Sequence, residues 1–384
     1  MMQTAKKVEH YITEHMDEFL DELRTVVNLE SHTYGAPEIK DQCGLYLKYL
    51  FEHLGFEVEC ITCKGVGTHI MGRLGKSDDR VLLVGHYDTV FPIGTTRERP
   101  FSMDDSRAYG PGIYDMKGGL ISFYFALKAL LELDIFPQGR EIDFFFNCDE
   151  ESGSATSKDY IMLLAQQAKA ALVAEPGHSG EGYVTSERFG RSVVTIKAIG
   201  EAGHAGNRPE YAANPLLTLS EIILYLESLC DKRRGIWYSP VCLHGGDVGA
   251  TAMTPAEACV VYDIRFLNEA LECEANEAIS NLDKYAKKVK LEITGGREKP
   301  PFSQDARQAP LLARAGKIVE ELGYSFMPTR LGGGSDCNFI ASVGCPTLCG
   351  LGLNGDFLHN PKEYVELGTI PVRVALLAEL IRTA

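Results

Sequence analysis

The chain has 384 residues, of which 45% are hydrophobic and 24% charged, as in ordinary globular proteins. Its 38 basic and 53 acidic side chains give a net charge of −15, which argues against binding to nucleic acid or to an anionic membrane surface. The length favours two domains, and an odd count of 11 cysteines is typical of a reducing compartment. The N-terminus has an amphipathic helical pattern without the apolar core of a signal peptide, so we expect a cytoplasmic protein.

The first half of the sequence alternates between helical and extended patterns. Apolar residues at helical spacing predict helices over residues 3–28, 38–54 and 118–133. Strand-like apolar runs lie at 68–74, 81–85, 142–147 and 171–174. Near-continuous apolar strands separated by helices predict a mostly parallel sheet with helices on both faces.

The pattern changes near Arg188. Segments of strand, helix, strand, strand, helix and strand character follow, which is the β-α-β-β-α-β order of a ferredoxin-like domain. The stretch 295–305 has the composition of a linker back to the first domain. We therefore expect an α/β protein with a discontinuous catalytic domain, residues 1–187 and 301–384, and an inserted lid domain, residues 188–300.

Five side chains with the chemistry of metal ligands lie just past strand-like runs or in glycine-rich loops. They are His86, Asp115, Glu151, Glu175 and His359. In open α/β sheets, ligands collect beyond the carboxyl ends of the strands. Two imidazoles and three carboxylates, one of them shared, suffice for two divalent cations. Nitrogen and oxygen ligands without thiolates favour catalytic Zn²⁺, with Co²⁺ or Mn²⁺ as alternatives.

Each of these segments also has a simpler structural interpretation. His86 and Asp88 can be a loop histidine and a turn aspartate, and Asp115 can cap the helix that follows it. The acidic run 149–151 can be a solvated turn, although adjacent carboxylates raise one another's pKa and divalent cations remove that cost. The joint occurrence of these residues at strand ends favours the metal site.

Seven segments together resemble the co-catalytic di-zinc peptidase and deacylase family. They are GHYDTVFP, YGPGIYDMKGG, CDEESGS, AEPG, GHAGNRPEYAANP, GGGSDCNFIA and FLHNPKEYV. This family includes glutamate carboxypeptidase, aminoacylase, acetylornithine deacetylase, succinyl-diaminopimelate desuccinylase and tripeptidase. The resemblance covers nearly the whole chain, with the segments in the family's order.

The resemblance implies a role for each candidate in the catalytic domain. Asp115 would bridge two zinc ions, and the peptide bond after it would be cis. His86 and Glu175 would bind one ion, and Glu151 and His359 the other. Glu150 would be the general base, and Asp88 would orient His86, since a metal-bound imidazole usually gives its other N–H to a carboxylate.

Further implied roles fall in or near the inserted domain. His204 would polarise the scissile carbonyl, in its own or the partner subunit's site, within a homodimer formed through the lid. Arg265 would bind a substrate carboxylate, although a surface arginine on a strand fits the sequence equally well. The N–H groups of Gly333 and Gly334 would face an anionic substrate end. Ala252 stands where many relatives have asparagine, so that substrate contact does not carry over.

We therefore expect a metal-dependent enzyme that hydrolyses an amide bond in a small peptide or N-acyl amino acid with a free carboxylate. Glu150 would take a proton from a water that bridges the metals and return it to the leaving amine. In relatives, glutamate at the position of Glu175 accompanies carboxypeptidases and deacylases, which favours a carboxypeptidase. The alternatives are an N-acyl amino acid deacylase, a tripeptide aminopeptidase and a non-catalytic binding module, and the complete set of ligands and base argues against the last.

Overall fold

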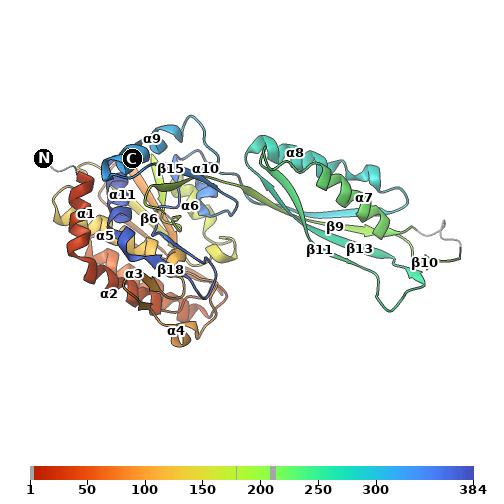
Figure 1. Cartoon of the computed structure of the whole chain (residues 1–384), viewed down its shortest axis with the longest axis horizontal. Coiled ribbons are helices and arrows are strands. Elements are labelled where there is room, and N and C mark those ends of the chain that lie inside the picture. The colour runs from red at the N-terminus through yellow and green to blue at the C-terminus, as the bar shows by residue number, and fades with distance from the viewer. Residues whose placement is uncertain (1–3, 179, 208–212) are drawn as a thin grey trace. The chain divides into compact units, whose positions relative to one another are not determined.

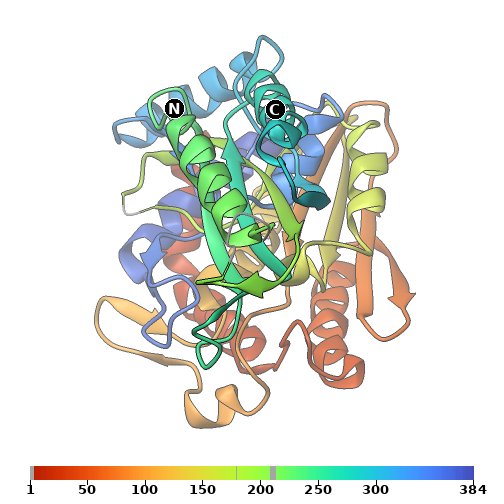
Figure 2. The same ribbon diagram turned by 90° about the vertical axis from the view of Figure 1, so that its right-hand side faces the viewer.

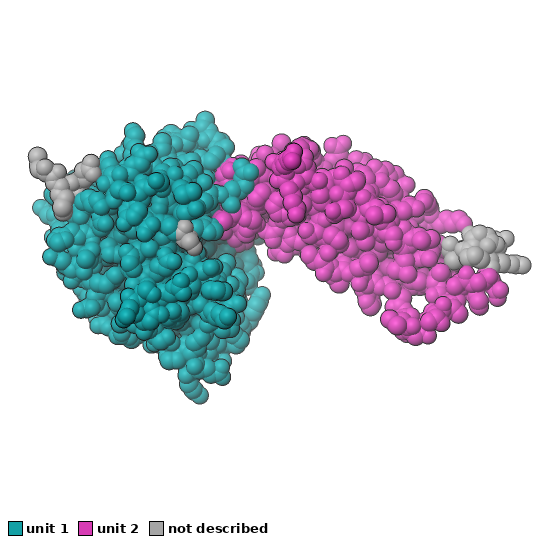
Figure 3. Space-filling model, in the orientation of Figure 1, with its two compact units in different colours: residues 1–186, 304–330, 335–384 teal, residues 187–303, 331–334 magenta. Residues whose placement is uncertain are grey.

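The computed structural model describes residues 4–178, 180–207 and 213–384 (Figure 1). The chain forms two compact units, which Figure 3 shows in different colours. Unit 1 comprises residues 1–186, 304–330 and 335–384, and unit 2 comprises residues 187–303 and 331–334. Within the described residues, no helix is long and apolar enough to cross a membrane.

A six-stranded sheet lies at the centre of unit 1, with the order β1-β2-β6-β3-β7-β16. Its strands are β1 (Glu57–Cys63), β2 (Gly67–Leu74), β3 (Arg80–His86), β6 (Glu141–Asn147), β7 (Ala170–Val173) and β16 (Thr347–Leu348). The last four of these run parallel, whereas β1 and β2 form an antiparallel edge. The prediction of a mostly parallel sheet in an α/β protein is confirmed. The strands β3, β6 and β7 thus end at one edge of the sheet.

Helices cover both faces of this sheet, because successive strand side chains point to opposite sides. On β6, the ring of Phe144 lies 4.6 Å from that of Phe51 in α3, whereas Phe145 stacks on Tyr160 in α6 at 6.0 Å. The first layer contains α1 (Thr4–Glu14), α2 (Met16–Asn28), α3 (Pro37–His53), α5 (Gly118–Glu132), α9 (Ala309–Leu322) and α11 (Ile370–Thr383). The second contains α6 (Lys158–Ala165) and α10 (Asp336–Ser342).

A second sheet in unit 1 consists of very short strands in the order β17-β18-β5-β4. They are β4 (Ser102–Met103), β5 (Arg107–Tyr109), β17 (Gly355–Asp356) and β18 (Tyr364–Glu366), and the short helix α4 (Thr95–Glu98) precedes them. The antiparallel pair β18–β5 aligns Tyr364 with Tyr109. Strands this short give no periodicity, so the sequence patterns do not predict this sheet. It places the loop after β5 beside the loop before β18.

Unit 2 has a four-stranded antiparallel sheet with the order β11-β13-β9-β14. Its elements in chain order are β9 (Gly190–Ile199), α7 (Pro215–Ser228), β11 (Ile236–Gly245), β13 (Glu257–Phe266), α8 (Glu269–Ser280) and β14 (Lys290–Lys299). This is the expected β-α-β-β-α-β order, and both helices lie on the same face of the sheet (Figures 1 and 2). The short pair β10 (Gly203–His204) and β12 (Met253–Thr254) also belongs to unit 2, whereas most residues of the pair β8 (Tyr183–Arg188) and β15 (Met327–Leu331) belong to unit 1.

Two local predictions were wrong. The helix expected over residues 3–28 is divided at His15, which has non-helical φ and ψ angles of −107° and 23°. The stretch from Gly295 to Lys299, expected to be linker, continues strand β14. Gly295 has a φ of +93°, and a Cβ there would lie 2.2 Å from the carbonyl oxygen of Val193. Only glycine fits this close pairing, so a residue usually found in turns lies within a strand here.

Gly119 brings helix α5 unusually close to the segment that carries Glu175. A Cβ at Gly119 would lie 2.0 Å from the carbonyl oxygen of Ala174. Helix α5 follows Asp115 in the sequence, and Ala174 directly precedes Glu175. The absence of a side chain at Gly119 therefore sets how closely two predicted ligands approach.

We predict that Gly119→Ala destabilises the protein, although alanine normally favours a helix over glycine by about 1 kcal/mol. Because the added methyl group meets backbone, the helix or the strand must shift, and the free energy of unfolding should fall by about 1–3 kcal/mol in urea denaturation. Gly368→Ala is the control, since no atom lies within 4 Å of its Cβ position. Unchanged or increased stability of Gly119→Ala would contradict the prediction.

Candidate metal centre

The carboxylate of Asp115 lies between the two predicted histidine ligands. Its Oδ1 is 3.2 Å from Nε2 of His86, and its Oδ2 is 3.0 Å from Nε2 of His359. Asp115 is buried, and the Asp115–Met116 peptide bond is cis, as the resemblance implies. Each carboxylate oxygen thus faces a different imidazole, which is the arrangement that a bridging ligand needs.

The two remaining carboxylates lie at opposite ends of this arrangement. Oε1 of Glu175 is 4.0 Å from Nε2 of His86, and Oε1 of Glu151 is 3.3 Å from Nε2 of His359. Ligand atoms of His86, Asp115 and Glu151 all lie within 4.8 Å of one another. The five residues therefore form two sets that share Asp115. Their role as metal ligands stays a prediction.

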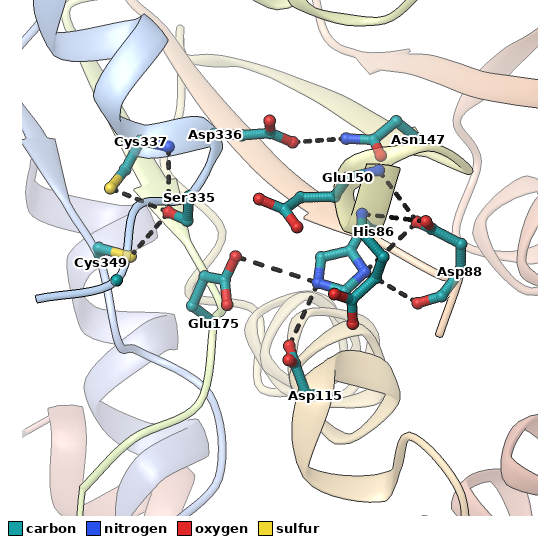
Figure 4. A network of polar contacts seen from close by, with 12 residues as sticks. His86, Asp88, Asp115, Asn147, Glu150, Glu175, Ser335, Asp336, Cys337 and Cys349 are labelled. Carbon is teal, nitrogen blue, oxygen red and sulfur yellow. Dashed lines mark hydrogen bonds and ion pairs between the residues drawn. The ribbon is translucent and has the colours of Figure 1, made fainter. Parts of the chain in front are cut away.

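Asp88 connects His86 to the turn that carries both glutamates of the acidic run. The Nδ1 atom of His86 is 3.0 Å from the carbonyl oxygen of Asp88 and 3.4 Å from its Oδ1. The carboxylate of Asp88 accepts the backbone N–H groups of Glu150 at 3.2 Å and Glu151 at 3.1 Å. Contacts to Nδ1 leave Nε2 of His86 directed at Asp115 and Glu175 (Figure 4).

The acidic run divides its carboxylates between structure and site. Asp149 accepts the backbone N–H and hydroxyl of Thr156, both at 2.8 Å, and the hydroxyl of Ser157 at 2.6 Å. These bonds fix the short turn Glu150–Ser152 that follows β6. Figure 4 shows the carboxylates of Glu150 and Glu175 on the same side of the His86 ring. The turn therefore offers Glu150 and Glu151 to the site while Asp149 holds it in place.

His359 lies in an irregular loop between β17 and β18. It has a φ of +57°, and Phe357 has a φ of +63°. Non-glycine residues seldom adopt this left-handed conformation, and such residues concentrate at functional sites. The side chain of His359 is 44% exposed, whereas that of His86 is 2% exposed. His359 is therefore the part of the site that lies nearest to solvent.

The electrostatics of the site fit divalent cations. Burial lowers the pKa of His86, but the bonds from Asp115 and Asp88 outweigh it and raise the pKa well above its usual value. Bonds to Asp115 and Glu151 raise the pKa of His359 to about 10. Burial and the charge of Asp115 raise the pKa of Glu151 to about 7. Crowded carboxylates thus draw protons onto the histidines, and cations would balance the same negative charge.

His204 lies on β10 in unit 2 and is exposed. Its Nδ1 accepts the backbone N–H groups of Gly206 at 3.0 Å and Asn207 at 3.2 Å. These contacts direct Nδ1 to its own loop, so the neutral ring carries its proton on Nε2. His204 lines a pocket together with residues 249–253, which include Ala252.

Arg265 on β13 is engaged within unit 2. Its Nε and Nη2 donate to the Asp263 carboxylate at 2.5 and 3.0 Å, and its Nη1 donates to the carbonyl of Gly332 at 2.9 Å. Arg188 donates to the carbonyl of Gly333 at 3.0 Å. Two arginines therefore hold the glycine-rich segment that contains Gly333 and Gly334.

The sequence patterns miss one residue of the site, Glu363. Its fully buried carboxylate accepts backbone N–H groups from the loop of Asp115. The only sequence signal is an acidic residue four positions after His359, which is not specific. Glu363 is recognised only from its contacts with Tyr114 and Asp115, which lie far from it in the sequence.

Comparisons with known proteins relate this chain to one family. The family model described as Peptidase family M20/M25/M40 matches residues 82–383. Carboxypeptidase G2 of Pseudomonas sp. (strain RS-16) is 32% identical over 371 residues, 94% of this chain and 87% of the relative. Succinyl-diaminopimelate desuccinylase of Bordetella avium (strain 197N) is 29% identical over 373 residues, 92% of this chain and 94% of the relative.

Solved structures share the fold at lower sequence identity. Aminopeptidase PepT of Bacillus cereus ATCC 10987 has a TM-score of 0.79 and 22% identity, with coverage of 95% of this chain and 98% of that one. The Bacillus subtilis YXEP protein, described as a dinuclear metal binding peptidase from the M20 family, has a TM-score of 0.71 and 14% identity, with coverage of 96% and 98%. At these identities the likeness concerns the fold alone.

We predict that Zn²⁺ releases protons when it binds to the metal-free protein, because His86 and His359 can bind a cation only as neutral imidazoles. Metal affinity should therefore fall as the pH decreases. It should rise as the pH increases toward about 10, the pKa of His359 in the metal-free protein. Calorimetric titration at pH 7 in two buffers with different protonation enthalpies measures the released protons. His359→Ala should release fewer, whereas His10→Ala, a change at an exposed histidine on α1, should match the unaltered protein. Identical heats in both buffers would contradict the prediction.

Proposed function

Because the chain belongs to peptidase family M20/M25/M40, we propose that this hydrolase cleaves an amide bond in a small peptide or N-acyl amino acid with a free carboxylate. The observation that carries the proposal is the pair of ligand sets that share Asp115, with Glu150 beside them. The likeness to carboxypeptidase G2 supports a carboxypeptidase. The likeness to desuccinylases favours an N-acyl amino acid deacylase as the second candidate, and a tripeptide aminopeptidase is the third.

The proposed ligands would hold two divalent cations, with Zn²⁺ first and Co²⁺ or Mn²⁺ as alternatives. His86 and Glu175 would bind one, Glu151 and His359 the other, and Asp115 both. When bound, the two cations would polarise the scissile carbonyl and lower the pKa of a water molecule toward neutrality. Membership of the family supports this count, because the Bacillus subtilis YXEP protein is described as a dinuclear metal binding peptidase of the M20 family.

The chain's own residues would move the protons. Glu150 would accept a proton from the attacking water at its carboxylate and deliver it to the nitrogen of the leaving amine. Asp88 holds the Glu150 backbone N–H and His86 together, so it fixes the base relative to the ligands. His204 would donate its Nε2 proton to the developing oxyanion, in its own or the partner subunit's site. Arg265, positioned by Asp263, and the N–H groups of Gly333 and Gly334 would receive the substrate carboxylate.

We further propose that residues 188–300 form a lid that also makes a homodimer. Two leucines on α7, Leu217 and Leu224, are 65% and 71% exposed, and Val241 on the edge strand β11 is 61% exposed. Such an apolar helix face beside an open strand edge fits a second copy of the same surface.

Sedimentation velocity should show a dimer that Leu224→Asp converts to monomer. Leu163→Asp in unit 1, at a leucine that is 56% exposed, is the control and should leave the dimer intact.

We predict that Glu150→Gln retains both metals but lowers kcat by about 10²–10⁴-fold, because glutamine cannot accept the proton. Metal content by mass spectrometry and amine release should be measured on the same sample. Glu98→Gln, at an exposed glutamate on α4, is the matched control and should leave both unchanged. Turnover of Glu150→Gln within a few-fold of the unaltered enzyme would exclude the role as base.

The substrate class is tested by a panel of dipeptides, tripeptides and N-acyl amino acids offered to the metal-loaded protein, with amine release as the readout. A carboxypeptidase should lose activity when the C-terminal carboxylate is amidated and keep it when the N-terminus is acylated. Loss on N-terminal acylation instead would favour the aminopeptidase. Absence of hydrolysis across the panel, with two metals bound, would support a binding module.

A further inference from the structure

Glu363 is a buried carboxylate that contacts the backbone beside Asp115. Its Oε1 accepts the backbone N–H groups of Tyr114 at 2.7 Å and Asp115 at 3.0 Å, and its Oε2 accepts that of Gly112 at 3.2 Å. The residue has 0% relative exposure. One side chain thus satisfies three N–H groups within four consecutive residues.

These N–H groups need such an acceptor because they belong to a kinked segment, the π-helical turn η1 (Ile113–Lys117) and Gly112 before it. Gly112 has a φ of +71°, and Asp115 and Met116 have non-helical backbone angles. Buried N–H groups without an acceptor destabilise the fold. The carboxylate of Glu363 therefore determines which conformation of this loop is stable.

Glu363 also belongs to the segment that positions His359. Its backbone N–H donates to the carbonyl of Asn360 at 2.9 Å, and the N–H of Asn360 donates to the carbonyl of Phe357 at 3.0 Å. Strand β18 begins directly after Glu363 and pairs with β5, which leads into the loop of Asp115. A short turn therefore connects His359 to Glu363, whose carboxylate accepts the backbone N–H groups of Tyr114 and Asp115.

We propose that Glu363 is a positioning residue that sets the separation of Asp115 and His359, and thereby the geometry of the metal pair. This inference rests on the proposed function, in which both residues bind metal. Glu363 does not touch the substrate or the metals in this scheme. It acts on the bridging carboxylate through the peptide N–H groups of Gly112, Tyr114 and Asp115 itself.

Burial and the negative charge of Asp115 raise the pKa of Glu363 to about 7, whereas the three N–H groups that it accepts lower it. Arg99 and Lys117 are the cations that its charge attracts. The guanidinium of Arg99 lies 4.8 Å from the ring centre of Phe91, and Nζ of Lys117 donates to the carbonyl of Leu29 at 2.6 Å. The Phe91 ring thus holds Arg99 in place, and the carbonyl of Leu29 holds Lys117.

The test compares Glu363→Gln with a matched control, Glu141→Gln. Glutamine keeps the shape of the side chain but presents an NH₂ group to at least one of the three N–H donors. Glu141 is also a buried carboxylate of unit 1 (1% exposed), and it accepts the backbone N–H of Ser77 at 2.8 Å. Glu141 is the first residue of β6, and Asn147, at the other end of this strand, pairs with His86. Glu141 therefore lies away from the site, and Glu141→Gln reports a general loss of stability.

The readouts are the visible spectrum of the Co²⁺-loaded protein, the number of bound metals, and kcat and KM on the best substrate of the panel. We expect Glu363→Gln to change the Co²⁺ spectrum and to lower metal affinity or kcat by about 10–100-fold with little change in KM. Glu141→Gln should match the unaltered protein in all of them, even if it unfolds at lower urea concentration.

An unaltered Co²⁺ spectrum and kcat in Glu363→Gln would overturn the positioning role while leaving the proposed function intact. Equal effects of Glu363→Gln and Glu141→Gln would also overturn it, because stability alone would then explain both. If the unaltered protein neither binds Co²⁺ nor hydrolyses any substrate, the proposed function fails and takes the positioning role with it. Should Glu363→Gln not fold, Glu363→Asp, which keeps the charge but shortens the reach by one methylene, gives the same readouts and the same criteria.

Discussion

The shared carboxylate of Asp115 is the constraint on which the rest of unit 1 depends. Its two oxygens must face His86, at the end of a central strand, and His359, in a loop near the C-terminus. His359 reaches it because the chain returns to unit 1 after residue 303 and supplies β17 and β18 on either side of this histidine. Two features keep the carboxylate in this position. The backbone of Gly119 lies close to that of Ala174, and the Glu363 carboxylate accepts the backbone N–H groups of Tyr114 and Asp115.

Negative charge is concentrated at this edge of the sheet, and each carboxylate has a different partner. Asp149 binds the turn that follows it, Asp88 binds two backbone N–H groups, and Asp115 binds two imidazoles. Aspartate thus serves as scaffold at Asp149, as orienting group at Asp88 and as candidate ligand at Asp115. The surrounding N–H groups decide between these roles, because a carboxylate saturated by backbone donors has little capacity left for a cation.

Much of the fold could be predicted from the sequence, because apolar strands and amphipathic helices carry strong periodic patterns. Residues 81–85 and 142–147 were found as strands almost to their ends. The prediction of a metal site rests on acidic and imidazole groups near those strand ends, and the structure brings these groups together. The small β4–β5–β17–β18 sheet and Glu363 could not be found in this way, because they depend on pairing between segments more than 200 residues apart. At Gly295 the sequence pattern misleads in another way. Glycine there suggests a turn, but the residue lies within strand β14, where the carbonyl of Val193 leaves no room for a side chain.

The position of α11 has a consequence for how the protein is made. This helix packs against both α1 and α5, so the apolar face of the N-terminal layer is covered by residues that are synthesised after unit 2. Unit 2, which has a hydrophobic core of its own, is synthesised in between and can fold on the nascent chain while that face is still open. His359 emerges only a few residues before α11. Unit 1 therefore gains the candidate ligand His359 and the core helix α11 together, after unit 2 has been synthesised, and a chain cut before residue 359 lacks both.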